Sequence, residues 1–171
     1  MSYYYWQCCH ALSKGNKMKS ALALVPQRKR TTIEMYDEMK GVIPLAKIIN
    51  TAKRLDSSLS EDEIVKRADA LAQWFAAIPI ALKAGKWFQM IETIDVVWHA
   101  FILNTRDYAR FCQMFYDGFL HHEPPMDYSE DRTEYARYTL ATIREEFGDR
   151  INPELENLSS DVKCCFRYVV D

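Results

Sequence analysis

Helix start and stop signals divide most of the chain into short amphipathic segments. The positions of these signals constrain the fold more than any other feature. Ser60 and Glu63 have the spacing of a capping box ahead of a long apolar segment. Asn152 and Pro153 are typical of the cap and first turn of a short last helix. The sequence therefore predicts an all-α fold, a single compact multi-helix domain of about six helices.

Glycine and proline predict where individual helices end. Gly41, Gly85 and Gly148 each follow an amphipathic segment, at the place where helices commonly stop. Pro79 lies inside the longest segment and lacks a backbone N–H. We therefore expect that helix to kink or end near Phe75.

The first part of the chain differs from the rest in charge. Its six basic residues all precede the first acid, Glu34, and are Lys14, Lys17, Lys19, Arg28, Lys29 and Arg30. No helical period is present there, so we expect residues 1–31 to form a mobile arm with an aromatic tip, "YYYW", and residues 32–171 to form the domain. A basic arm beside an acidic domain favours contact with another protein, and nucleic acid would be bound through the arm only.

The composition excludes several classes of protein. A length of 171 residues with 49% hydrophobic residues is ordinary for one globular domain. No segment has the roughly 18 apolar residues of a membrane span or the basic start of a signal peptide, so we expect a cytoplasmic protein without membrane contact. The five cysteines then predict no disulfide framework. Phosphate-binding glycine loops and dinucleotide fingerprints are absent from the sequence.

Three of the four histidines lie in the pieces "DVVWHAFILNTRDYARFC" and "GFLHHEP". Asp95 and His99 are four residues apart, so on a helix the carboxylate can accept one ring N–H and fix the tautomer of the imidazole. His121 and His122 follow on a predicted loop, where neighbouring side chains point to opposite sides and one of them can face His99. The candidate metal ligands are His99, His121, His122 and Cys112, with Asp95 and Glu123 in the second shell and Trp98, Tyr108 and Arg106 as the pocket wall.

Cys112 has a competing interpretation as a core thiol. It belongs to an apolar stripe with steps of four and three: Ile94, Trp98, Phe101, Thr105, Tyr108, Cys112 and Phe115. On one straight helix Cys112 points roughly 220° away from His99, so the two side chains could not share a metal. Asn104 with Asp107 has capping-box-like spacing, and a helix break there would let the thiol approach His99.

The ligand types leave two interpretations open. Imidazoles with a thiolate or carboxylate suit zinc, and histidines with carboxylates also suit iron, so zinc or iron is the expected cofactor if there is one. The spacing matches neither H-E-x-x-H nor C-x-x-C. A structural Asp–His–aromatic cluster with no metal would use the same residues.

The same stretch resembles the conserved segment of the glycine-rich domain-containing-protein-like family, whose pattern is D-x-x-W-H, then T-R-x-Y-x-x-F-C, then H-H-x-P. The matching positions are Asp95, Trp98, His99, Thr105, Arg106, Tyr108, Phe111, Cys112, His121, His122 and Pro124. With only five glycines the chain looks like the short microbial type without the glycine-rich tail. The resemblance implies no established reaction, but it implies that the polar residues act together.

Three functions fit these residues. The first is an intracellular helical binding module whose Asp-His-His(-Cys) pocket holds a transition metal. The second is a metal-dependent enzyme that activates water, with Asp95 or Glu123 as base, or less favourably a Cys112 nucleophile with His99 or His121. The third is a structural adaptor or inhibitor without metal. The sequence identifies no catalytic residue.

Overall fold

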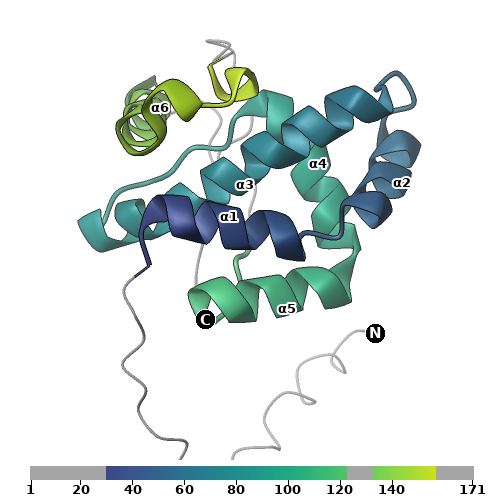
Figure 1. Cartoon of the computed structure of the whole chain (residues 1–171), viewed down its shortest axis with the longest axis horizontal. Coiled ribbons are helices and arrows are strands. Elements are labelled where there is room, and N and C mark those ends of the chain that lie inside the picture. Colours follow the sequence, from purple (N-terminus) through teal and green to yellow (C-terminus); the bar gives the residue numbers. More distant parts are fainter. Residues whose placement is uncertain (1–29, 123–132, 157–171) are drawn as a thin grey trace, which may run out of the picture.

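A computed structural model of the protein describes residues 30–122 and 133–156, and within these ranges the regular elements are helices (Figure 1). The predicted all-α fold is confirmed. The six α-helices are α1 (Thr32–Val42), α2 (Leu45–Leu55), α3 (Glu61–Ala84), α4 (Glu92–Leu103), α5 (Thr105–Tyr116) and α6 (Thr133–Phe147), followed by the 3-10 turns η1 (Gly148–Arg150) and η2 (Pro153–Leu155). The predictions for the arm at residues 1–29 and for Glu123 lie outside the described residues.

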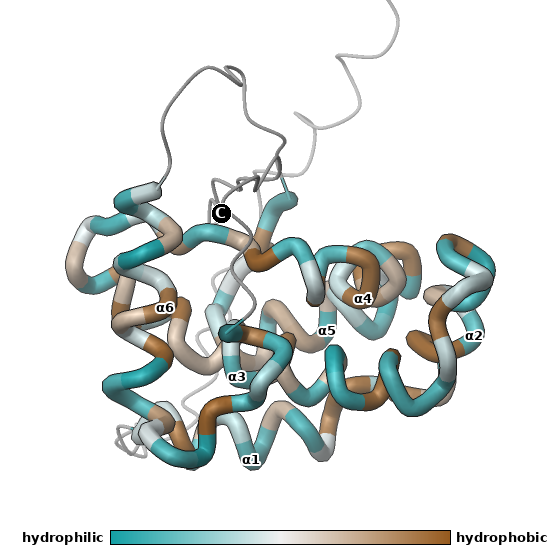
Figure 2. Tube along the Cα trace, turned by 90° about the horizontal axis from the view of Figure 1, so that it is seen from above, coloured by the Kyte–Doolittle hydropathy of each residue, from teal (hydrophilic) through white to brown (hydrophobic). Residues whose placement is uncertain are grey.

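The longest helix, α3, forms the centre of the domain. It packs against α1, α2, α4, α6 and η2, while α5 packs against α4. Figures 1 and 2 show α2 and α6 at opposite ends of this arrangement. Trp74 and Phe75 of α3 meet Trp98 of α4 with ring centroids 5.2 and 6.0 Å away. The aromatic core therefore lies between α3 and α4, the helix that carries Asp95 and His99.

Hydrophobic and hydrophilic segments alternate along the helices, as Figure 2 shows by colour. This alternation is what the predicted amphipathic pattern requires, because each helix buries one stripe and leaves the other in water. Among the described residues no helix combines the length and the apolar character that crossing a lipid bilayer requires.

Most of the predicted helix ends are confirmed. Ser60 and Glu63 form the capping box of α3, and Gly85 closes that helix in the left-handed conformation with φ +63°. The predicted stop at Gly41 is wrong, because α1 continues to Val42. Pro44 is the better explanation for the end of α1, since a proline disfavours helical conformation at the residue before it, and Ile43 is extended.

Pro79 does not end α3, which continues to Ala84. The carbonyl of Phe75 would normally accept from the N–H of residue 79, and a proline has none. The hydroxyl of Tyr116 donates to this carbonyl at 2.8 Å instead. A tertiary hydrogen bond thus takes the place of the missing helical one.

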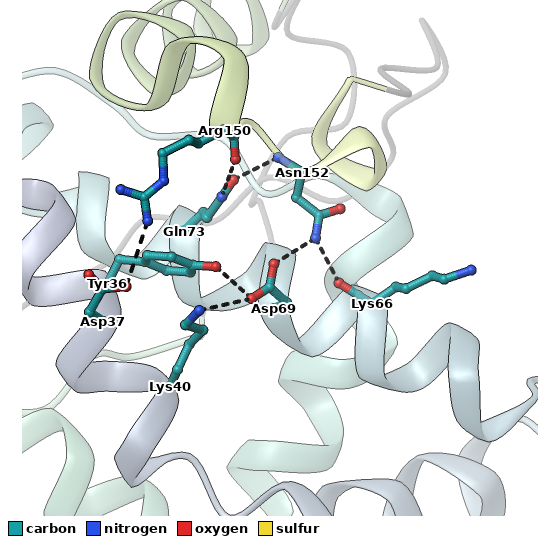
Figure 3. A network of polar contacts seen from close by, with 8 residues as sticks. All are labelled: Tyr36, Asp37, Lys40, Lys66, Asp69, Gln73, Arg150 and Asn152. Carbon is teal, nitrogen blue, oxygen red and sulfur yellow. Dashed lines mark hydrogen bonds and ion pairs between the residues drawn. The ribbon is translucent and has the colours of Figure 1, made fainter.

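A polar network joins α1, α3 and the segment that follows η1 (Figure 3). Asp69 of α3 accepts hydrogen bonds from the hydroxyl of Tyr36 at 2.6 Å and from the side-chain amide of Asn152 at 2.9 Å. Gln73 accepts from the backbone N–H of Asn152 and donates to the carbonyl of Arg150. Asn152 is also the predicted cap of the short last helix, since it accepts from the N–H of Glu154. The network holds the C-terminal turns against α3.

Candidate metal centre

Asp95 and His99 are neighbours on α4, as their spacing predicts. Nδ1 of His99 lies 3.2 Å from Oδ2 of Asp95. The side chain of His99 is 43% exposed and that of Asp95 only 18%, because α4 buries its other face through Trp98 and its neighbours. The pair therefore sits at the edge of the core, with the imidazole reaching toward solvent.

His122 completes a cluster with this pair. Its Nε2 lies 3.6 Å from Oδ1 of Asp95, and its ring centroid lies 4.4 Å from that of His99. The His122 ring also packs on the indole of Trp98 at 4.6 Å, and its side chain is only 15% exposed. One donor atom each from Asp95, His99 and His122 can be chosen so that all three lie within 4.8 Å of one another.

The distances between these donors suit a metal ion. Two donors that are each about 2.1 Å from a tetrahedral zinc ion lie about 3.4 Å from each other. Oδ2 of Asp95 lies 3.2 Å from Nδ1 of His99, and its other oxygen, Oδ1, lies 3.6 Å from Nε2 of His122, so each histidine has a carboxylate oxygen near that distance. Oδ1 of Asp95 is also buried and accepts no hydrogen bond within the described part of the chain. A buried carboxylate oxygen is stabilised by a cation, so the residues present fit a metal.

The electrostatics of the Asp95–His99 pair favour the charged form of both residues. Burial raises the pKa of Asp95, but the interactions with His122 and His99 outweigh burial, so the pKa lies below its ordinary value of 3.8. The hydrogen bond with Asp95 raises the pKa of His99 above 6.5, although partial burial opposes this change. Asp95 is therefore a carboxylate at neutral pH, which is the form that binds metal.

Two predicted ligands lie apart from the cluster. His121 packs its ring on Phe119, with centroids 4.7 Å apart, and does not belong to the donor group. Cys112 is fully buried, and burial raises the pKa of its thiol. The thiol is also outside the donor group, which fits the core interpretation of the apolar stripe.

The helix does break at Asn104, but the break does not bring Cys112 to His99. Asn104 forms no side-chain cap for α5; its amide donates to the carbonyl of Ala100 at 2.8 Å and to the hydroxyl of Thr51 at 3.2 Å. Asp107 forms an ion pair with Lys47 instead of the expected capping interaction. The buried faces of α4 and α5 therefore meet in one core, and among the stripe residues only Thr105 is exposed.

The predicted wall residues occupy different positions. Trp98 contacts His122 directly, and Tyr108 lies behind Trp98, since the indole Nε1–H donates to its hydroxyl at 3.2 Å. Arg106 is exposed on α5, and within the described ranges it has no hydrogen bond or ion pair with the cluster. Arg30, expected to contact a partner, binds Glu38 at 2.8 Å and lies 5.7 Å from the Phe115 ring centroid. The other five basic residues of the arm lie outside the described residues.

The carboxylate of Asp95 lies between two imidazoles, among the potential donors, whereas the sequence predicts for it a position behind the ligands. The adjacency of Asp95 and His99 on a helix was visible in the sequence. The approach of His122 to the second carboxylate oxygen was not, because it depends on how the segment after α5 returns to α4.

Comparison with known proteins corrects the family resemblance that the sequence motif suggests. A family profile described as UCP032817-like matches residues 29–155, well over half of the chain. Nothing in this match indicates the glycine-rich domain-containing-protein-like family, so that resemblance was wrong; it depended on about thirty residues of motif. No curated protein and no solved structure shows significant similarity to the chain. The matched range contains α1 to α6 and all three donor residues. The chain belongs to the UCP032817-like family, whose function is uncharacterised.

Proposed function

We propose that the protein is a helical binding domain that holds one divalent transition-metal ion through Asp95, His99 and His122. The observation that carries this proposal is the position of the Asp95 carboxylate between the two imidazoles, with Oδ1 buried and facing His122. Three donors from two separate segments meet there. The ion would supply positive charge to the carboxylate and link the segment after α5 to α4.

The donor set favours zinc or iron(II). Two imidazoles and one carboxylate are a common ligand set for both ions, whereas calcium and magnesium prefer oxygen donors. The hydrogen bond between Asp95 and Nδ1 of His99 leaves Nε2 of that ring on its other side. Nε2 of His99 is therefore available as a donor atom while Asp95 orients the ring through Nδ1.

The adjacent histidines provide a matched test. Protein purified without a metal-chelating tag is stripped with a chelator, and zinc is then added during measurement of metal content and melting temperature. We expect one ion per chain and a higher melting temperature, because a ligand that binds only the native state stabilises it. His122→Ala should abolish both effects and His121→Ala should retain them. Equal behaviour of the two variants, or no stoichiometric binding of zinc or iron(II), would reject the proposal and favour an adaptor without metal.

A second candidate function is metal-dependent hydrolysis at the same residues. It is favoured by the 43% exposure of the His99 side chain and by a donor set of three within the described ranges. Catalytic metal sites commonly combine three protein ligands with an open position, and a bound metal there would activate water. Asp95 would then serve as a ligand, which leaves it unsuited to act as the base. Zinc-dependent hydrolysis of an activated ester, lost in His122→Ala and retained in His121→Ala, would support this function.

The proposal also names the kind of partner. We propose that a binding domain of this kind contacts another protein, with the basic residues before Arg30 as the contact. A pull-down that compares the full chain with a variant in which Lys14, Lys17, Lys19, Arg28 and Lys29 are changed to Glu tests it. Identical sets of bound proteins would remove the support for this contact.

A further inference from the structure

Tyr108 connects the two segments that supply the candidate ligands. It lies on α5 and is fully buried. Its hydroxyl donates to the backbone carbonyl of Leu120 at 2.6 Å and accepts from Nε1–H of Trp98 at 3.2 Å. The direction of both bonds is fixed by chemistry, because a carbonyl oxygen only accepts and an indole N–H only donates.

Both partners of Tyr108 adjoin the metal centre. Trp98 lies on α4 between Asp95 and His99, one residue before the latter, and its ring packs on that of His122. Leu120 is two residues before His122 in the chain. One hydroxyl group therefore holds both the indole against which the His122 ring rests and the backbone that leads to it.

The side chains around Leu120 alternate as in an extended segment. Leu120 is fully buried, whereas Phe119 and His121 are half-buried and pack their rings on each other at 4.7 Å. His122 lies against Trp98 and Asp95. Because side chains of extended backbone alternate between two faces, a shift of one residue would turn His121 toward Asp95 and His122 away.

We infer that Tyr108 is a positioning residue that fixes this register and so selects His122, rather than His121, as the partner of Asp95. The inference rests on the proposed metal site for its functional meaning, but the selection itself is a property of the protein without metal. The edge-to-face contact of the Tyr108 ring with Phe119, at 5.3 Å, reinforces the same register. Tyr108 touches none of Asp95, His99 and His122 in the described contacts and acts through Leu120 and Trp98.

Tyr108→Phe removes only the hydroxyl, and Tyr36→Phe is its matched control. Tyr36 is also buried and also donates a 2.6 Å hydrogen bond, but to Asp69 of α3, in the network of Figure 3, which contains none of the candidate donors. We expect Tyr108→Phe to weaken zinc binding by about 10- to 100-fold, the range of second-shell changes. Tyr36→Phe should lower the melting temperature and leave zinc affinity unchanged. Zinc affinity is measured by competition with a chromophoric chelator.

A measurement without metal separates this inference from the proposed function. In the stripped protein, proton NMR should show nuclear Overhauser contacts between the rings of His122 and Trp98, whose centroids are 4.6 Å apart. These contacts should be lost or strongly reduced in Tyr108→Phe and retained in Tyr36→Phe. If they change in this way while the wild-type protein binds no zinc or iron(II), the positioning role stands and the proposed function fails.

The opposite result overturns the positioning role. Unchanged contacts between His122 and Trp98 in Tyr108→Phe would show that the hydroxyl does not set the register, whatever the metal does. If Tyr108→Phe does not fold, Trp98→Phe replaces it, because it keeps an aromatic ring beside His122 and removes the N–H from which Tyr108 accepts, together with part of the indole ring. We expect zinc affinity to fall in that variant and the cross-peaks of His122 to shift. If neither change occurs, the inference is overturned.

Discussion

The hydroxyl group of Tyr116 donates a hydrogen bond to the backbone carbonyl of Phe75 over 2.8 Å. That carbonyl lies four residues before Pro79, so it is the one that lost its helical donor. The last residue of α5 thus donates a hydrogen bond to the one carbonyl of α3, the central helix, whose helical donor Pro79 removes. The donor that replaces the missing helical one belongs to a residue 41 positions away in the sequence.

This relationship predicts a coupling between Tyr116 and Pro79. Tyr116→Phe should lower the free energy of unfolding by about 1 to 2 kcal/mol, since it leaves a backbone carbonyl in the helix without a donor. In a Pro79→Ala background the N–H of residue 79 can serve the Phe75 carbonyl, so the loss should be smaller by about 0.5 to 1 kcal/mol. Urea unfolding of the four proteins measures this cycle. Equal losses in both backgrounds would contradict the proposed substitution of one donor for another.

The variant Asp95→Asn distinguishes two roles for this carboxylate: direct coordination of the metal and orientation of His99. If its carboxylate binds the ion, Asp95→Asn should weaken zinc affinity by more than about 100-fold, beyond the usual range of second-shell changes. The Co(II) absorption spectrum should change in the same variant, because the ligand set differs. A smaller loss with an unaltered Co(II) spectrum would place Asp95 outside the coordination shell, as the position that orients His99.

The metal-free protein should show a defined pH dependence at this pair. The pKa of His99 is raised by Asp95, so its stabilising contribution is present below 6.5 and is lost as the pH rises through the folded-state pKa. The pKa of Asp95 is lowered, against the effect of burial, by His122 and His99, so its contribution is present above 3.8 and is lost as the pH falls through the folded-state pKa. The pair stabilises the metal-free protein most between these two values.

The variant His99→Gln tests this window. The difference in melting temperature between wild type and variant should be greatest near about pH 5 and should decrease above neutral pH. Zinc affinity should follow the opposite course and rise with pH, because protons compete with the metal for the imidazoles. A difference in melting temperature that is constant from acid to alkaline pH would show that the pair contributes nothing through its charges.

Cys112 should be unreactive in the folded protein. Its side chain is fully buried, and burial raises the pKa of the thiol, so little thiolate is present at neutral pH. A variant with Cys8, Cys9, Cys164 and Cys165 changed to Ser leaves this thiol alone for measurement. Its reaction with a disulfide reagent should be on the order of 100-fold slower in buffer than in denaturing urea. Fast reaction of the folded variant would restore Cys112 as a candidate nucleophile.

The sequence by itself determined the features that depend on neighbours within a few positions. The capping box of Ser60 and Glu63 and the left-handed Gly85 follow from local hydrogen bonds and local backbone sterics. Asp95 and His99 meet because one helical turn separates them. The apolar stripe also predicted that Cys112 lies in the core, since a helix buries one face whatever the partner is.

Tertiary structure decided the rest, because contacts between distant segments depend on how helices pack. His122 reaches Asp95 while His121 turns to Phe119, and the sequence offered both histidines equally. Local rules predict that α3 kinks or ends near Phe75, whereas α3 continues through Pro79 and the Phe75 carbonyl accepts a hydrogen bond from Tyr116 of another helix. In the first case an imidazole from far along the chain comes within 3.6 Å of a carboxylate, and in the second a hydroxyl from far along the chain donates to a carbonyl that has no helical donor. A local sequence pattern cannot predict such a group, because only the packing of distant segments brings it close.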